Sequence, residues 1–222
     1  MSLLGAITAK PWLPEPAPPP LGPVVPAARV GLRVLLAVIT TLFGLFLLAF
    51  LIRAQLPDWQ ALVGTAGRPL ASLAPLWLNT ALLLAGSLAM QAASVAARRD
   101  NAVAMRVALA AGGLFALAFL VGQGLVWQRF IALGHFVASN PAASFFYLLT
   151  AVHGLHLAGG LVAWARVLVR ARHGTPAASL RLGVELCAVY WHFLFAVWLV
   201  LFALLASPQQ SLRALAEICG IR

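Results

Sequence analysis

The chain has 222 residues, of which 63% are hydrophobic and only 9% are charged. A soluble domain carries roughly one quarter charged residues, so this composition excludes an ordinary soluble domain and indicates an integral membrane protein. The formal net charge of +10 would suggest nucleic-acid binding in a soluble protein. Here the arginines stand at the ends of apolar runs, where they act as topology markers and headgroup anchors, so we expect no nucleic-acid partner.

Apolar stretches recur along the chain, each long enough to cross about 30 Å of hydrocarbon. They predict an all-α membrane protein made of one five-helix bundle, with no separate soluble domain. If the N-terminus is cytoplasmic, the inner side receives ten basic residues and the outer side five, which favours an N-in, C-out orientation. The predicted spans are 34–52, 76–97, 107–128, 143–165 and 184–206.

The two ends of the chain differ from the bundle. Residues 1–28 hold eight of the fourteen prolines and predict an extended cytoplasmic arm, lying on a partner or on the membrane surface, or a disordered tail. This region has no apolar core of a cleavable signal peptide. We assign residues 29–207 to the transmembrane domain and 208–222 to a short outer tail.

Polar residues are sparse in the first three spans. Thr40 and Thr41 are the polar side chains of the first span, and their hydroxyls can bond to carbonyl groups one turn earlier. In the second span Ser87, Gln91 and Ser94 recur at spacings of four and three, which predicts one polar face turned toward another helix. The loop before it carries Asp58 and Trp59, a predicted interfacial anchor, and the third span ends in polar residues that include Gln123.

The last two spans carry the histidines. The segment FFYLLTAVHGLHLAGGLVAW places His153 and His156 near the membrane midplane, and His192 of the fifth span lies at a similar depth. Three imidazoles at one depth could ligate a metal or a haem. Alternatively, neutral histidines could donate hydrogen bonds across the bundle and hold the helices together. The three-residue spacing without an accompanying carboxylate favours this second interpretation. Glu185 lies about two turns below His192, near the inner interface, where it can meet an arginine.

Four stretches, in order, resemble the subunit III family of haem-copper terminal oxidases. They are LWLNTALLLAGS at 76–87, GGLFALAFLVGQ at 112–123, FFYLLTAVHGLHLAGG at 145–160 and ELCAVYWHFLFAVWLVLF at 185–202. The paired histidines of HGxH and the later YWHFxxxVW are the most specific parts. The resemblance covers residues 34–206 and identifies the chain as a divergent five-span bacterial member.

The resemblance implies a role without redox chemistry in this chain. Haem and copper would lie in the catalytic subunit I, against which this chain would pack together with subunit II, in a bacterial plasma membrane. The chain would bind phospholipid and support proton uptake by the complex. The residues expected to form a structural polar core are His153, His156, Glu185, Tyr190, Trp191, His192, Asn79 and Gln123, those expected to bind lipid are Arg29, Arg33, Arg98, Arg99 and Arg106, and no catalytic or metal-binding residue is expected.

Some family features are missing. The first span lacks the glutamate that members commonly carry, and Phe195 stands where the closing signature has an aspartate. Because of these departures, the chain could instead be a subunit that accompanies a bacterial nitric oxide reductase. Two alternatives of other classes also stay open, namely a haem-binding membrane cytochrome, with His153 or His156 and His192 as axial ligands, and a small transporter.

Overall fold

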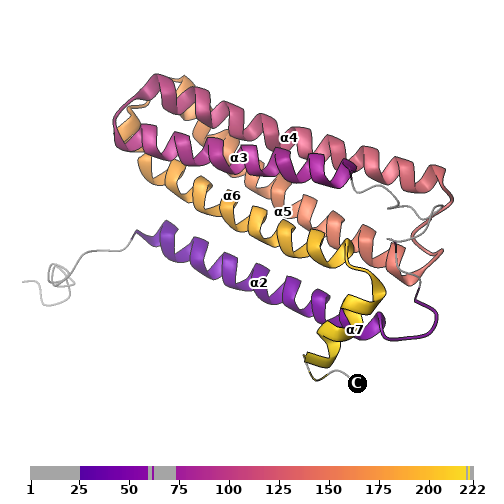
Figure 1. The fold of residues 1–222 in the computed structure, drawn as a ribbon. Coiled ribbons are helices and arrows are strands. Elements are labelled where there is room, and N and C mark those ends of the chain that lie inside the picture. Colours follow the sequence, from indigo (N-terminus) through magenta and orange to yellow (C-terminus); the bar gives the residue numbers. More distant parts are fainter. Residues whose placement is uncertain (1–25, 60–61, 63–73, 219, 221–222) are drawn as a thin grey trace, which may run out of the picture.

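The structure, a computed structural model, describes residues 26–59, 62, 74–218 and 220. Within these ranges all regular structure is helical (Figure 1), and five helices are long and apolar enough to cross a membrane, which confirms the predicted all-α fold and its five spans. The N-in, C-out orientation stays a prediction, and the proline-rich arm falls almost entirely outside the described residues. The helices are α2 (Ala27–Arg53), α3 (Ala74–Arg98), α4 (Ala102–Ala132), α5 (Pro141–Arg172), α6 (Ala177–Leu205) and α7 (Gln209–Ile218).

Local sequence signals set the helix ends. The side chain of Asn101 accepts a hydrogen bond from the backbone N–H of Ala104 at 3.0 Å and caps α4. Asn140 caps α5 in the same way, and Pro141 occupies the first helical position, where its missing N–H costs nothing. The helices continue past most of the apolar runs, because a helix keeps its backbone hydrogen-bonded into the headgroup region. The fifth run is the exception, since α6 ends one residue before Ala206.

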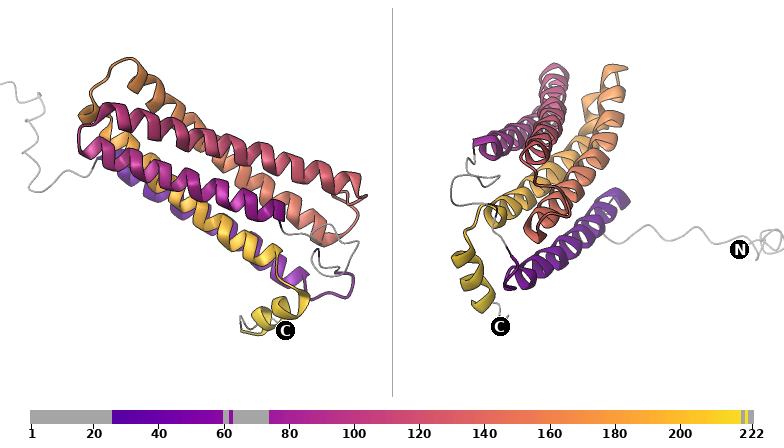
Figure 2. Two further views of the ribbon diagram at one scale, coloured as in Figure 1. Left: turned by 45° about the horizontal axis from the view of Figure 1, so that its top comes forward. Right: turned by 90° about the vertical axis from the view of Figure 1, so that its right-hand side faces the viewer.

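Four of the long helices form a packed bundle, while α2 stands apart along one side of it (Figures 1 and 2). Small residues let α3 and α4 approach closely: a Cβ atom added to Gly86 would lie 3.4 Å from the carbonyl oxygen of Gly112. The side chain of Met90 then covers Gly112, where an added Cβ would come within 2.8 Å of the methionine methyl group. The two glycines and the flexible methionine side chain therefore allow α3 and α4 to pack closely.

Helix α2 is exposed over most of its length and buries only Ile39, Phe43 and Phe50. The hydroxyls of Thr40 and Thr41 donate to carbonyl oxygens one turn earlier, at 2.8 and 3.0 Å, which confirms the sequence prediction. Helix α2 is thus a mostly apolar rod that contacts the bundle at a few points along its length.

The residues that follow α2 stabilise its C-terminal end through packing, an ion pair and a hydrogen bond. Trp59 is buried and packs edge-on against Phe50 with ring centroids 5.0 Å apart. Arg53 forms a bidentate ion pair with Asp58. The hydrogen bonds from Arg53 lower the pKa of the Asp58 carboxyl below its ordinary value. Helix α7 closes the same end, because Gln209 donates to the carbonyl oxygen of Ala54 at 3.4 Å.

Candidate functional site

His153 lies at the centre of the bundle and is fully buried. Three aromatic rings from three other helices surround it: Phe43 of α2, Phe119 of α4 and Trp198 of α6, with ring centroids 6.5, 5.6 and 5.4 Å away. Neither ring nitrogen has a hydrogen-bond partner within the described part of the chain. The imidazole therefore acts here as a packing element on which four helices meet.

His156 lies one turn further along α5 and is only partly buried. Its Nδ1–H donates to the carbonyl oxygen of Val152 in the same helix at 2.8 Å, and its ring lies 5.6 Å from that of Phe43. The carbonyl oxygen of His156 accepts the hydroxyl proton of Tyr190 at 2.9 Å, which links α5 to α6. The backbone of this residue, and not its imidazole, makes the hydrogen bond between helices.

His192 points to the opposite side of α6, toward α3. Its Nδ1 contacts the hydroxyl of Ser87, and its Nε2 lies 3.1 Å from Oε1 of Gln91. The predicted polar face of the second span therefore meets this histidine, while Ser94 accepts instead from Arg98 in its own helix. Both nitrogens of His192 are engaged by side chains of α3.

The three histidines do not form one site. His153 and His156 contact Phe43, whereas His192 contacts Ser87 and Gln91 on the far side of α6. Within the described ranges, no three His, Cys, Asp or Glu side chains are arranged to hold a metal ion. The rotation of each helix about its axis sends the three side chains to different neighbours, and their common depth in the membrane stays a prediction.

Further hydrogen bonds tie the spans together. The amide of Asn79 on α3 donates to Oε1 of Gln123 on α4 at 3.0 Å, and both side chains are buried. Trp191, also expected in the polar core, is buried at the junction of α6 with Gly86 of α3 and Gly160 of α5.

Sequence reasoning missed three tryptophan hydrogen bonds. The indole N–H groups of Trp198, Trp127 and Trp164 donate to Thr80 at 2.9 Å, to Thr150 at 3.0 Å and to the carbonyl oxygen of Leu109 at 2.8 Å, respectively. A buried tryptophan N–H usually finds an acceptor, and this tendency was the available signal. Trp191 is an exception, because its buried N–H has no partner in the described part of the chain.

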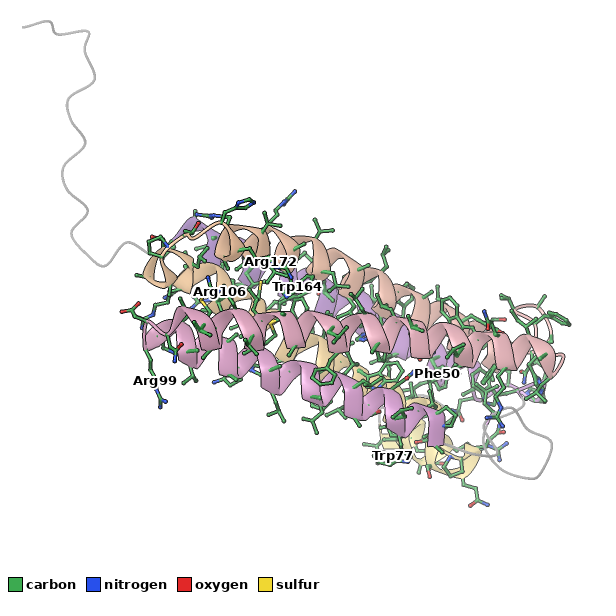
Figure 3. The ribbon with its side chains drawn as sticks, turned by 90° about the horizontal axis from the view of Figure 1, so that it is seen from above. Phe50, Trp77, Arg99, Arg106, Trp164 and Arg172 are labelled. Carbon is green, nitrogen blue, oxygen red and sulfur yellow. The ribbon has the colours of Figure 1, made fainter. Side chains whose placement is uncertain are left out.

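A cluster of charged side chains lies at the end of the bundle where α2 begins. The Glu185 carboxylate lies 3.2 Å from Arg29 of α2, 3.4 Å from Arg181 of α6 and 3.9 Å from Arg98 of α3. Two of the arginines expected to bind lipid, Arg29 and Arg98, therefore form ion pairs with the same carboxylate, that of Glu185. No ion pair joins the other three, Arg33, Arg99 and Arg106, to any described residue; Arg99 and Arg106 lie toward the same end of the bundle (Figure 3).

Next to this cluster, an apolar groove of about 500 Å³ separates α2 from α5 and α6. Glu185 directly precedes one lining residue, Leu186, and Arg29 lies one turn before another, Leu32. Cys187, Tyr190 and Trp191 contribute from α6, and His156, Gly159 and Gly160 contribute from α5. The groove thus runs from the charged cluster toward the middle of the bundle.

The fold and these contacts define a class, a five-span membrane protein whose polar side chains largely pair within its own bundle. The family model described as cytochrome c oxidase subunit III matches residues 23–206. The chain belongs to this family, and with its five apolar helices it is a multi-pass protein of a bacterial plasma membrane. The family match favours neither the cytochrome nor the transporter interpretation.

Curated relatives carry the same description. The "Cytochrome c oxidase subunit 3" of Synechocystis sp. is 32% identical over 162 residues, which are 72% of this chain and 66% of that protein, just under two thirds of its length. The protein of the same name from Thermostichus vulcanus is 31% identical over 178 residues, 79% of this chain and 85% of that protein. A "Probable cytochrome c oxidase subunit 3" of Nocardia farcinica is 31% identical over 161 residues, 72% of this chain and 77% of that protein.

Proposed function

We propose that this chain is an accessory subunit of a haem-copper terminal oxidase and carries no redox centre itself. Haem and copper would reside in the catalytic subunit I, and this chain would pack beside that subunit and subunit II to stabilise the complex during aerobic electron transport. Membership of the subunit III family and the names of its relatives support this assignment.

One observation carries the proposal for the chain itself: His153 and His192 are enclosed by contacts within their own bundle, whereas His156 bonds through Nδ1 to its own helix and lines the groove beside α2. His192 engages Ser87 and Gln91 with both nitrogens, and His153 sits within aromatic rings. An axial haem ligand must turn a ring nitrogen toward a space that a porphyrin can fill. The contacts of His192 and His153 instead suit residues that hold helices at fixed positions, which is what a scaffold subunit needs.

We further propose that the groove between α2, α5 and α6 binds a phospholipid. Its wall is apolar and suits an acyl chain. At its end three guanidinium groups surround the single Glu185 carboxylate, leaving an excess of positive charge beside the groove. Arginine forms strong charge-assisted hydrogen bonds with phosphate, so Arg29 and Arg98 would hold the headgroup. Arg33, Arg99 and Arg106 would contact further headgroups.

Support of proton uptake by the complex is proposed from the family resemblance. Glu185 is the one acidic residue within the five spanning helices, and its carboxylate is paired with arginines. Any contribution of this chain would therefore be indirect, through the position of the catalytic subunit and its surrounding lipid.

The proposal is tested by purifying the chain from its own membranes in mild detergent through an affinity tag. We expect the largest co-purifying protein to be a haem-copper catalytic subunit, with haem absorbance in proportion to that protein. Recovery of the chain without such a companion would overturn the proposal, as would haem bound in equal amount to the isolated chain.

A further inference from the structure

A hydrogen-bonded pair of polar side chains lies at the surface of the bundle. Gln91 of α3 is exposed and His192 of α6 is partly buried, and they meet at 3.1 Å where the two helices run side by side (Figure 1). The neighbouring exposed side chains are apolar: Leu88 on α3 is 59% exposed and Val189 on α6 is 48% exposed. The polar pair is therefore set within an apolar surface.

The pair lies at hydrocarbon depth. His192 is about 22 Å from the start of α6 and about 20 Å from its end, at roughly 1.5 Å per residue. Gln91 lies about 10 Å inside the Arg98 end of α3 and reaches toward the level of His192. Lipid tails offer no hydrogen bond at this depth, so an exposed amide is costly there.

The chemistry of the two side chains shows which groups remain unused. Oε1 of Gln91 can only accept, so Nε2 of His192 must carry the proton. In the neutral imidazole Nδ1 is then an acceptor, and the hydroxyl of Ser87 donates to it. The amide NH₂ group of Gln91 is left with two donors, and among the described residues neither has a partner.

Other surfaces of the bundle differ. The exposed side chains in the middle of α4 are apolar, including Leu114 at 66%, Val121 at 65% and Leu125 at 59%, as expected of a surface that faces lipid tails. The exposed hydroxyls of Thr40 and Thr41 on α2 are already bonded to carbonyls of their own helix. The α3–α6 surface differs because the exposed amide donors of Gln91 have no hydrogen-bond partner among the described residues.

We propose that the α3–α6 surface around Gln91 and His192 receives a transmembrane helix of the catalytic subunit. That helix would present a hydrogen-bond acceptor, a backbone carbonyl or a side-chain oxygen, to the amide of Gln91. This assignment depends on the proposed function and adds to it the surface by which the chain assembles. Polar side chains that cross-link helices are a common means of association in lipid, where apolar burial drives little.

Site-specific photo-cross-linking in native membranes tests the surface. The benzophenone amino acid p-benzoylphenylalanine is placed at Leu88, beside Gln91, and at Val121 on α4 as the matched control. We expect the Leu88 variant to cross-link to the catalytic subunit and the Val121 variant not to do so. Cross-linking from Val121 alone, or from neither position while the complex stays intact, would overturn the assignment.

A second measurement follows the hydrogen bond itself. Gln91→Leu should lower the amount of catalytic subunit retained on the tagged chain during a detergent challenge by about three- to twentyfold, the range for one hydrogen bond between membrane helices. Leu125→Ala on α4 is the control and should retain it fully. Equal retention by both variants would refute the role of Gln91. If the unsubstituted chain recovers no catalytic subunit at all, the proposed function fails together with the surface.

Discussion

The indole of Trp164 on α5 lies directly over Gly113 of α4. A Cβ atom at Gly113 would overlap the six-membered ring of that indole, and the indole N–H donates to the carbonyl oxygen of Leu109 at 2.8 Å. The absence of a side chain at Gly113 therefore lets α5 reach the backbone of α4 (Trp164 is labelled in Figure 3).

Gly113→Ala should destabilise the bundle by about 1–3 kcal/mol, because the methyl group would displace the indole and break its hydrogen bond. Thermal or denaturant unfolding of the purified chain in detergent measures the change. Gly124→Ala on the same helix is the matched control, since an added Cβ there meets open space. The packing role of Trp164 would be refuted if both variants unfolded alike.

Thr80→Val should destabilise the protein by about 1–3 kcal/mol, because it leaves the indole N–H of fully buried Trp198 without an acceptor. Combining it with Trp198→Phe in a double-mutant cycle should give a coupling of roughly 0.6–1.7 kcal/mol. Thr41→Val on α2 is the control, because its hydroxyl bonds only within its own helix. Zero coupling would show that the bond contributes nothing to stability.

Arg29→Gln should reduce the phospholipid that stays bound to the purified chain by about twofold or more, since a charge-assisted contact with phosphate is lost. Native mass spectrometry of the chain in detergent counts the retained lipids. Arg172→Gln, at the same end of the bundle but on α5, serves as the control (Figure 3). Unchanged lipid binding in Arg29→Gln, or an equal loss in both variants, would argue against the groove as the lipid site.

The pair of Arg53 and Asp58 predicts a small dependence of stability on acid. The folded protein holds the pKa of Asp58 below its ordinary value of 3.8, so the ion pair contributes stability above that pH and loses it as the pH falls through the lowered pKa. Unfolding followed between pH 5 and about 2 in the parent and in Asp58→Asn checks this. The parent should lose more stability than the variant across this interval, and identical curves would contradict the prediction.

Hydropathy was sufficient to predict the five spans, because each apolar run must stay helical in lipid. It could not predict where His153 and His192 point, since the sequence sets the depth of a residue along a helix but not the rotation of that helix against its neighbours. The contact between Asn79 and Gln123 could be predicted from the sequence, because buried amides in adjacent spans need partners. The shared use of Glu185 by Arg29, Arg181 and Arg98 depends on three chain segments meeting, which no local pattern reveals.

Haem content of variant complexes tests most directly whether the signature histidines are structural. His156→Leu and His192→Leu are purified as complexes with the catalytic subunit, and the haem absorbance is measured per catalytic subunit. We expect unchanged haem absorbance together with weaker retention of this chain, most clearly for His192→Leu, which removes both contacts with α3. Loss of a haem signal in either variant would contradict the account.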